Sequence, residues 1–473
     1  MSYLVKPRHL ARPVTERLEP DPSLPRACVI GAGSSGIAAA KALHLARVPF
    51  DCFEAGTVVG GNWVFDNPNG MSACYRNLEI NTSCPRMAYS DFPMPDYYPD
   101  YARHWEVRDY FERYVDHFGF RHTITFGTRV EHVERRTDGV FEVTVDGPDG
   151  PQVREYEAVL VANGHHWHPR WPDPAYPGEF DGEQIHAHDY REPDSLAGRD
   201  VLVVGMGNSA MDIAVDASYV AASTTISVRR GQWLFPKFLL GRPSDQTPQP
   251  TWLPWSVRRR AFDIGARATG DLTRHGLPEP DHRPGESHPV QGDRFVARLR
   301  DGRIAARPGI ERLAGDRVVF RDGTEVVADL IVWCTGYKVS FPFFDPGFVS
   351  APGNDLPLWK RVVHPDLPGV FFVGLLQPLG AVMPLAEAQS AWVADLLAGR
   401  YVPPTDDVVR RETVAEHEAM KRRFYASPRH TMEVDFDLYL ADLAKERARG
   451  RDRAAAGAPP VFRRVSSPAH PAR

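Results

Sequence analysis

Three glycines in the segment ACVIGAGSSGIAAA have the spacing of a dinucleotide-binding loop. Gly31 allows a tight turn after a buried strand, Gly33 allows a pyrophosphate to approach the backbone, and Gly36 allows the next helix to pack closely on the sheet. Unpaired N–H groups at the start of that helix can bind the phosphates. Glu54 ends the next apolar strand, 18 residues after Gly36, where its carboxylate can accept hydrogen bonds from ribose hydroxyls. These features occur in order and predict a dinucleotide site.

A second loop of the same kind follows the apolar run DVLVV. It reads Gly205-x-Gly207-x-x-Ala210, and alanine is a tolerated replacement for the third glycine. The strand after this loop ends in Arg229 and Arg230, where the first copy has an acid. A carboxylate would repel a 2′-phosphate, whereas guanidinium groups can bind it. This site is therefore predicted to prefer NADP to NAD. The alternative interpretation is a pair of surface arginines at a strand end.

Histidines gather in the segments GHHWH and HAH, which raises the question of a metal site; they are His165, His166, His168, His186 and His188. A zinc site needs three or four convergent ligands with supporting partners. Two histidines one residue apart on an extended segment point to opposite faces. The five cysteines are scattered and form no C-x-x-C pair, so we predict no metal site.

The elements around the two loops predict an α/β fold with two doubly wound, Rossmann-like dinucleotide-binding domains. Both copies close with a buried strand that ends in a small polar residue and a glycine, in YEAVLVANGHH and ADLIVWCTGY. Short strands around Asp-Gly turns precede each of these strands and predict two small antiparallel flaps. We expect the second unit to be inserted within the first, which resumes after about residue 340.

Composition places the 473-residue chain among globular proteins large enough for two or three domains. The net charge of −5 gives no basic field for nucleic acid, and we expect the short run Arg258–Arg260 on a solvated face. No stretch approaches the roughly 20 apolar residues of a membrane span. We therefore expect a soluble, cytoplasmic protein with no nucleic-acid or membrane partner. Its C-terminal segment from Lys445 onward is expected to begin as a fraying helix, and residues 446–473 are assigned to a disordered tail.

Residues 26–445 resemble the flavin-containing monooxygenases of the soluble bacterial branch, which are class B flavoprotein monooxygenases. The resemblance rests on the motifs GAGSSG, GGNW, YRNLEINTS, YSDFPMP, RRGQW, CTGY and GLLQPLGAVMPLAEAQ. The family fingerprint F-x-G-x-x-x-H-x-x-x-(Y/F) is met by Phe180, Gly182, His186 and Tyr190. Baeyer–Villiger monooxygenases are similar but place tryptophan at the last position, so Tyr190 favours the first group.

The resemblance implies one FAD and one NADPH. It divides the chain into an N-terminal extension (1–25), a first FAD-binding part (26–170), an inserted NADP-binding domain (171–337) and a second FAD-binding part (338–445). Residues implied to bind FAD are Gly31, Gly33, Ser34, Ser35, Gly36, Glu54, Gly61, Asn62, Trp63, Asn81, Thr82 and Gln377. Residues implied to bind NADPH are Gly205, Gly207, Asn208, Ser209, Arg229 and Arg230. Ser209 could instead cap its helix.

The resemblance also implies the reaction. Reduced flavin and O2 would form a C4a-hydroperoxyflavin, which bound NADP+ shields from water. Its outer oxygen would then pass to a soft nucleophile, an amine nitrogen or a sulfide sulfur of a small molecule. Asn81 matches the family asparagine beside the flavin, where an amide can hydrogen-bond the oxygenated cofactor. The alternative for Asn81 is a turn-capping role.

Three other activities stay open at the level of sequence: Baeyer–Villiger insertion into ketones, NADPH oxidation without a dedicated substrate, and nucleotide binding without catalysis. Two intact loops together with Asn81 argue against the last of these. A homodimer is compatible with the pattern but not required by it.

Overall fold

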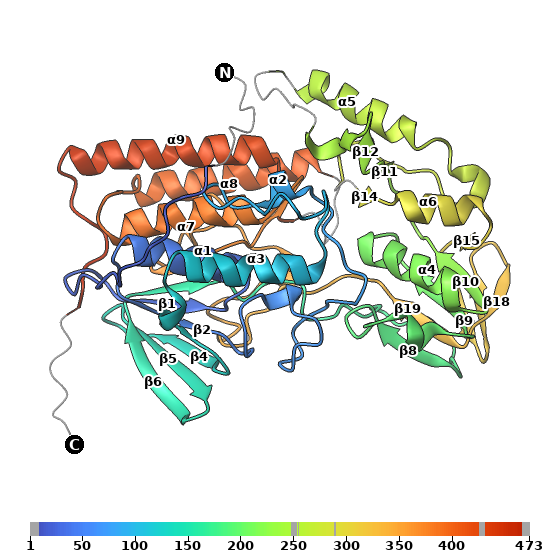
Figure 1. Cartoon of the computed structure of the whole chain (residues 1–473), viewed down its shortest axis with the longest axis horizontal. Helices are drawn as coiled ribbons and strands as arrows, with labels where there is room; N and C mark the ends of the chain where they lie inside the picture. Colours follow the sequence, from blue (N-terminus) through green and yellow to red (C-terminus); the bar gives the residue numbers. More distant parts are fainter. Residues whose placement is uncertain (1–8, 247–252, 254, 288–289, 425–430, 466–473) are drawn as a thin grey trace.

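The computed structural model describes residues 9–246, 253, 255–287, 290–424 and 431–465, and in them two five-stranded parallel sheets form the centres of two units (Figure 1). The first sheet has the order β20-β7-β1-β2-β3 and comprises β1 (Ala27–Ile30), β2 (Phe50–Phe53), β3 (Ile124–Thr125), β7 (Ala158–Val161) and β20 (Val370–Phe372). The second has the order β15-β10-β9-β19-β8 and comprises β8 (Glu183–His186), β9 (Asp200–Val204), β10 (Ser223–Ser227), β15 (Ala305–Arg307) and β19 (Leu330–Trp333). The second sheet lies in the chain between β7 and β20, which confirms two doubly wound units, one inserted in the other.

Each unit also carries the predicted small antiparallel flap, and each flap has three strands. The first consists of β4 (Arg129–Arg135), β5 (Phe141–Gly147) and β6 (Gly150–Tyr156). The second consists of β16 (Ile310–Ala314), β17 (Arg317–Phe320) and β18 (Glu325–Val327). Both flaps are therefore confirmed. The shorter strands are β11 (Leu234–Phe235), β12 (Phe238–Leu239), β13 (Arg242–Pro243), β14 (Val290–Gln291), β21 (Gln377–Pro378) and β22 (Glu433–Val434).

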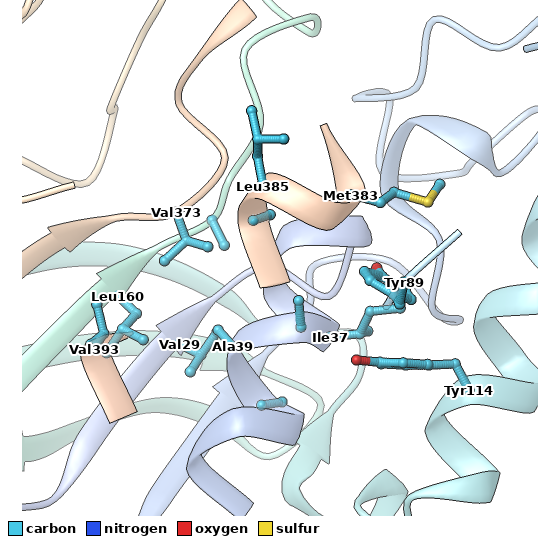
Figure 2. Close-up of a cluster of buried hydrophobic side chains, with 14 of the residues drawn as sticks. Val29, Ile37, Ala39, Tyr89, Tyr114, Leu160, Val373, Met383, Leu385 and Val393 are labelled. Carbon is cyan, nitrogen blue, oxygen red and sulfur yellow. The ribbon is translucent and has the colours of Figure 1, made fainter. Parts of the chain in front are cut away.

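The core of the first unit lies between its sheet and the helices α1 (Ser34–Leu45), α3 (His104–His117) and α7 (Met383–Leu397). Figure 2 shows Val29 of β1 and Leu160 of β7 near Ile37 of α1 and Val393 of α7. Alanines on α1 let α7 approach closely, so apolar side chains from distant parts of the chain are buried together. Each large apolar side chain buried in this way stabilises the fold by about 1.5–3 kcal/mol.

The remaining helices are α2 (Cys84–Met87), α4 (Asn208–Val220), α5 (Trp255–Ala268), α6 (Asp293–Arg300), α8 (Asp406–Arg423) and α9 (Phe436–Ala455). Arg258 of α5, expected on a solvated face, is instead buried and pairs with Asp435 at 2.5 Å. Asp435 is the N-cap residue of α9 and accepts a hydrogen bond from the N–H of Leu438. Arg258 therefore forms a contact between the inserted unit and the first unit, because its partner Asp435 lies after β20 in the first unit, 177 residues further along the chain.

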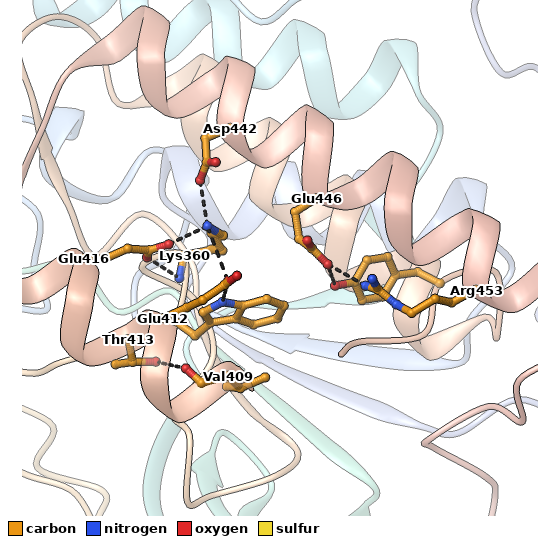
Figure 3. A network of polar contacts seen from close by, with 10 residues as sticks. Lys360, Val409, Glu412, Thr413, Glu416, Asp442, Glu446 and Arg453 are labelled. Carbon is orange, nitrogen blue, oxygen red and sulfur yellow. Dashed lines mark hydrogen bonds and ion pairs between the residues drawn. The ribbon is translucent and has the colours of Figure 1, made fainter. Parts of the chain in front are cut away.

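Helix α9 continues to Ala455, so the helix expected at the start of the C-terminal segment is present, whereas the assignment of residues 446–455 to a disordered tail is wrong. Asp395 of α7, whose side chain is 2% exposed, accepts hydrogen bonds from Arg447 and Arg451, each at 2.7 Å. The Tyr401 hydroxyl donates to Glu446 at 2.9 Å. Arg453 donates to the same carboxylate, as Figure 3 shows. These partners lie outside the tail, so its polar composition did not reveal them. Residues 1–8 of the extension and 466–473 of the tail lie outside the described residues.

Asp395→Asn is expected to lower the free energy of unfolding by about 1–3 kcal/mol at neutral pH, because charge-assisted hydrogen bonds from three arginines are weakened. Burial alone would raise the pKa of Asp395, but Arg447, Arg451 and Arg400 lower it below its ordinary value. The carboxylate therefore stabilises the fold above its unfolded value of 3.8, and this contribution is lost as pH falls through the lower folded value. Urea denaturation across pH measures both effects. Equal stability of variant and wild type at neutral pH would contradict this account of α9.

Candidate active site

The turn between β1 and α1 has the backbone predicted for a pyrophosphate-binding loop. Gly31 has φ +99°, and a Cβ there would lie 2.8 Å from the carbonyl oxygen of Ala162. A Cβ on Gly36 would lie 1.8 Å from the carbonyl oxygen of Gly31, so the helix could not pack as closely with any side chain there. Gly33 is the N-cap residue of α1 and has no side-chain cap. The first N–H groups of α1 are thus left for an anion.

Glu54 lies beside this turn, at the end of β2. Its Oε2 accepts the N–H of Ala32 at 2.7 Å, and its Oε1 accepts the N–H of Gly56 at 2.6 Å. Burial raises the pKa of Glu54, and the two amide hydrogen bonds act in the opposite direction. The carboxylate is therefore fixed next to the loop, and each oxygen retains a further lone pair for a ribose hydroxyl.

The Gly-Gly-Asn-Trp segment folds back onto the same turn. The short 3-10 helix Gly61–Trp63 (η1) begins beside it, and the N–H of Gly60 donates to the carbonyl oxygen of Ala32 at 3.1 Å. A Cβ on Gly33 would lie only 3.5 Å from Cα of Gly61. Asn62 uses its Oδ1 to accept the N–H of Ala73 at 2.8 Å, which ties the segment to the following loop.

The return segment after β20 reaches the loop as well. A Cβ on Gly374 would lie 1.9 Å from Oγ of Ser35. Tyr89, from a separate segment after α2, also reaches the loop, and its hydroxyl donates to the carbonyl oxygen of Ser34 at 2.6 Å. Gln377 lies three residues further on, in β21, where its N–H donates to Met432 at 2.8 Å. The loop, Glu54, Gly61–Trp63 and this return segment therefore gather at one edge of the first sheet. Four converging elements of this kind fit the pyrophosphate and ribose of one dinucleotide.

Gly33→Ala is expected to fold but to bind FAD at least about tenfold more weakly, because the Cβ would occupy the approach of the pyrophosphate. The backbone of Gly33 has φ −73°, which alanine adopts, and the nearest protein atom to the Cβ is 3.5 Å away. Titration of the apoprotein with FAD measures the affinity, and its melting temperature checks the fold. Gly36→Ala is the contrasting variant and should fold poorly. Unchanged FAD affinity in Gly33→Ala would argue against a phosphate at this turn.

Asn81 is an exposed residue that follows the bridge between Glu79 and Arg103. Within the described chain its side chain makes no hydrogen bond, and the N-cap of α2 is Ser83, so a turn-capping role is not what the structure shows for it. Thr82, by contrast, is buried. The N–H of Ser83 donates to Oδ2 of Asp245 in the inserted unit at 2.6 Å. Asn81 therefore lies at the contact between the two units, which we call the seam. Its side-chain amide makes no hydrogen bond with the described residues.

The second glycine loop repeats the first. Gly205 has φ +132°, and a Cβ there would lie 2.6 Å from the carbonyl oxygen of Cys334. Gly207 is the N-cap residue of α4 without a side-chain cap, so Ser209 does not cap this helix. Asn208 keeps a buried Oδ1 that has no partner in the described chain. The first turn of α4 thus presents backbone and side-chain groups that fit the phosphates of a second dinucleotide.

Arg229 and Arg230 follow β10 at the same sheet edge as Gly205. Arg229 is exposed, whereas Nε of Arg230 lies 2.6 and 2.7 Å from the two carboxylate oxygens of Asp281. The hydrogen bond from Arg230 is the main cause that lowers the pKa of Asp281 to about 2. Arg229 is therefore better placed than Arg230 to bind a 2′-phosphate. The partner Asp281 was missed in the sequence because it lies 51 residues away in a proline-rich segment.

Three of the fingerprint residues lie along β8 and its approach. A Cβ on Gly182 would lie 2.6 Å from the carbonyl oxygen of Asp329 and 2.7 Å from the ring of Phe180, so only glycine fits. His186 is fully buried, accepts the N–H of His188 at Nδ1, and packs edge-on against Tyr337. Burial lowers the pKa of His186 to about 4, so the ring is neutral and acts in packing at the connection between the units.

The fourth fingerprint residue, Tyr190, is buried, and its hydroxyl donates to Oδ2 of Asp216 on α4 at 2.7 Å. The sequence model of the flavin-binding monooxygenase-like family matches residues 25–449 of this chain. The chain belongs to this family. The flavin-containing monooxygenase 5 of Cavia porcellus is 31% identical over 439 residues, which cover 89% of this chain and 82% of that protein.

Two further similar proteins carry names that describe a reaction. One is the N-oxide-forming dimethylaniline monooxygenase 2 of Macaca mulatta, 31% identical over 440 residues, with 89% of this chain and 82% of that protein covered. The other is the solved structure of S-allyl-L-cysteine S-oxygenase from Allium sativum, with a TM-score of 0.68 and 26% identity. That match covers 92% of this chain and 93% of the other.

Family membership confirms that this flavin-binding monooxygenase is an FAD-dependent NADPH monooxygenase, as the sequence predicted. No helix in the described part of the chain has the length and apolar character needed to cross a membrane. Among the described residues, no group of three or more histidine, cysteine, aspartate and glutamate side chains is arranged to hold a metal ion. The roles of individual residues, the domain boundaries and the homodimer stay predictions.

Proposed function

We propose that this monooxygenase uses NADPH and O2 to oxygenate an amine nitrogen or a sulfide sulfur of a small molecule. The observation that supports this choice most directly is the complete fingerprint with Tyr190 at its last position, where Baeyer–Villiger relatives have tryptophan. The names of two similar proteins, one N-oxide-forming and one an S-oxygenase, point to the same pair of atoms.

In this proposal the first loop, with Ser34, Ser35, Glu54 and Gly61–Trp63, holds FAD, and Thr82 and Gln377 lie on the flavin side. The second loop, with Asn208 and Ser209, holds NADPH. Reduced flavin, when bound, would supply the two electrons that activate O2. The protein binds and orients both nucleotides and excludes water between them, which is how a protein contributes when the cofactors carry the chemistry.

The exposed amide of Asn81 at the seam supplies a hydrogen bond to the oxygen that is being activated. Such a donor acts by being already in place, so that it does not have to reorganise as charge develops. A soft nucleophile needs no proton transfer before it attacks, which agrees with a site built from binding groups rather than from a catalytic acid and base.

Product analysis with a thioether, a tertiary amine and a cyclic ketone tests the proposed reaction. We expect a sulfoxide and an N-oxide, formed in step with NADPH consumption. A lactone from the ketone as the only product would contradict the proposal and support Baeyer–Villiger chemistry. NADPH consumption that yields only hydrogen peroxide with every substrate would support an oxidase.

We also propose a cytoplasmic location. All five cysteines are free, and four of them are buried, which fits a reducing compartment.

A further inference from the structure

A short segment of the first unit, Tyr75–Asn77, is hydrogen-bonded directly to α4 of the inserted unit. The Tyr75 hydroxyl donates to Oδ2 of Asp212 at 2.6 Å, and Nδ2 of Asn77 donates to Oδ1 of Asp216 at 2.9 Å. Asp212 and Asp216 are four residues apart on α4 and therefore lie on the same face of the helix. One helix face thus offers two carboxylates to one segment of the other unit.

The linker that follows β8 contacts one of these carboxylates, Asp216. Tyr190 donates to Oδ2 of Asp216, and its ring lies 5.8 Å from the ring of Tyr75. The N–H of Arg76 donates to the carbonyl oxygen of Arg191 at 2.7 Å, so the segment and the linker run side by side. We call Tyr75, Asn77, Tyr190, Asp212 and Asp216 the phenol–carboxylate clamp. The family fingerprint accepts phenylalanine in place of Tyr190, so its hydroxyl bond is a feature of this chain.

The buried carboxylates of the clamp are costly to ionise unless their hydrogen bonds keep a good geometry. Burial raises the pKa of Asp212 to about 6 and also raises the pKa of Asp216, while hydrogen bonds from Tyr75 and Tyr190 oppose that rise. Buried carboxylates are stable only with well-aligned partners, and losing one partner leaves the other uncompensated. Such a contact therefore specifies one arrangement of the two units rather than merely holding them together.

The clamp residues lie close in the chain to the second glycine loop and to Asn81. Asp212 lies one turn after the start of α4, the helix that begins at the second glycine loop. Tyr75 lies six residues before Asn81 on the same segment. We propose that Tyr75 and Tyr190, acting through Asp212 and Asp216, are positioning residues that hold the NADPH-binding helix in register with the segment that carries Asn81. This inference rests on the proposed function, because it needs NADPH at the second loop.

The test compares the double variant Tyr75→Phe/Tyr190→Phe with Tyr401→Phe. Tyr401 donates a hydrogen bond to the buried Glu446 between α7 and α9, so its variant loses a bond of the same kind away from the seam. The first measurement is the rate of flavin reduction by NADPH without oxygen, in a stopped-flow instrument. We expect the double variant to be slower by at least about tenfold, since misplacement by about 1 Å can cost up to about 10²-fold. Tyr401→Phe should reduce at the wild-type rate.

A second measurement does not depend on turnover. Spin labels on Val153→Cys and Val327→Cys, exposed positions on the two flaps, report the distance between the units in the absence of nucleotides. The distance distribution should broaden in the double variant and stay narrow in Tyr401→Phe. The conservative variant Asp212→Asn keeps an amide oxygen as acceptor for Tyr75 and should retain most of the reduction rate.

A reduction rate in the double variant within about twofold of wild type would overturn the inference. If the double variant does not fold, the same rate is measured in Tyr190→Phe, which keeps the ring and loses only the hydroxyl. A wild-type protein that contains FAD but is not reduced by NADPH would instead refute the proposed function. The two failures are therefore distinguishable.

Discussion

Asn81→Ala should keep its FAD and consume NADPH, but it should form product at least about 10²-fold more slowly, with most of the reducing equivalents released as hydrogen peroxide. The side chain is exposed and makes no hydrogen bond within the described chain, so its removal should cost the fold little. What is lost is a donor that is already in place at the seam. The ratio of NADPH consumed to product and to hydrogen peroxide measures the effect.

Asn81→Asp is the matched control, because it keeps the size of the side chain but replaces the N–H donor by an acceptor. It should fail in the same way as the alanine variant. A melting temperature near that of wild type would show that both effects are local. Normal product yield in either variant would remove Asn81 from the mechanism.

Arg229→Ala should raise the KM for NADPH by about 10–100-fold and leave the KM for NADH nearly unchanged. One charge-assisted hydrogen bond to the 2′-phosphate, worth about 1.5–3 kcal/mol, accounts for that range. NADH lacks this phosphate, so its KM should not depend on Arg229. Steady-state kinetics with both nucleotides measures the discrimination.

Arg230→Ala is the comparison, and its effect should be smaller because Arg230 is held by Asp281. If Arg230 does leave Asp281 to bind the phosphate, Asp281→Asn should lower the KM for NADPH. Equal changes for NADPH and NADH in Arg229→Ala would refute a 2′-phosphate site at the end of β10.

Local patterns were sufficient to predict the two glycine loops, the flaps and the insertion of one unit in the other. The reason is that a strand, a tight turn and a helix are determined by neighbouring residues, as in the segment from Ala27 to Ala40. Two copies of one pattern with similar closing strands then fix the order of the domains. The tight fit at Gly36 and Gly182 likewise follows from motifs readable along the chain.

The features missed in the sequence are pairings between residues far apart in the chain. Helix α9 is extended by contacts with Asp395, Arg258 is buried by Asp435, and Arg230 is held by Asp281. None of these partners lies near in the chain. The clamp did leave a signal, because Asp212 and Asp216 lie one turn apart in the otherwise apolar stretch AMDIAVDA of α4, where unpaired acids would be costly.

The central claim is that the two glycine loops hold two different dinucleotides, FAD at the first and NADPH at the second. The most direct test is the absorbance spectrum of the purified protein before and after anaerobic addition of NADPH or NADH. The account predicts a yellow protein whose flavin absorbance bleaches faster with NADPH than with NADH, and it predicts that Arg229→Ala removes this preference. A colourless protein that takes up no added FAD would contradict it.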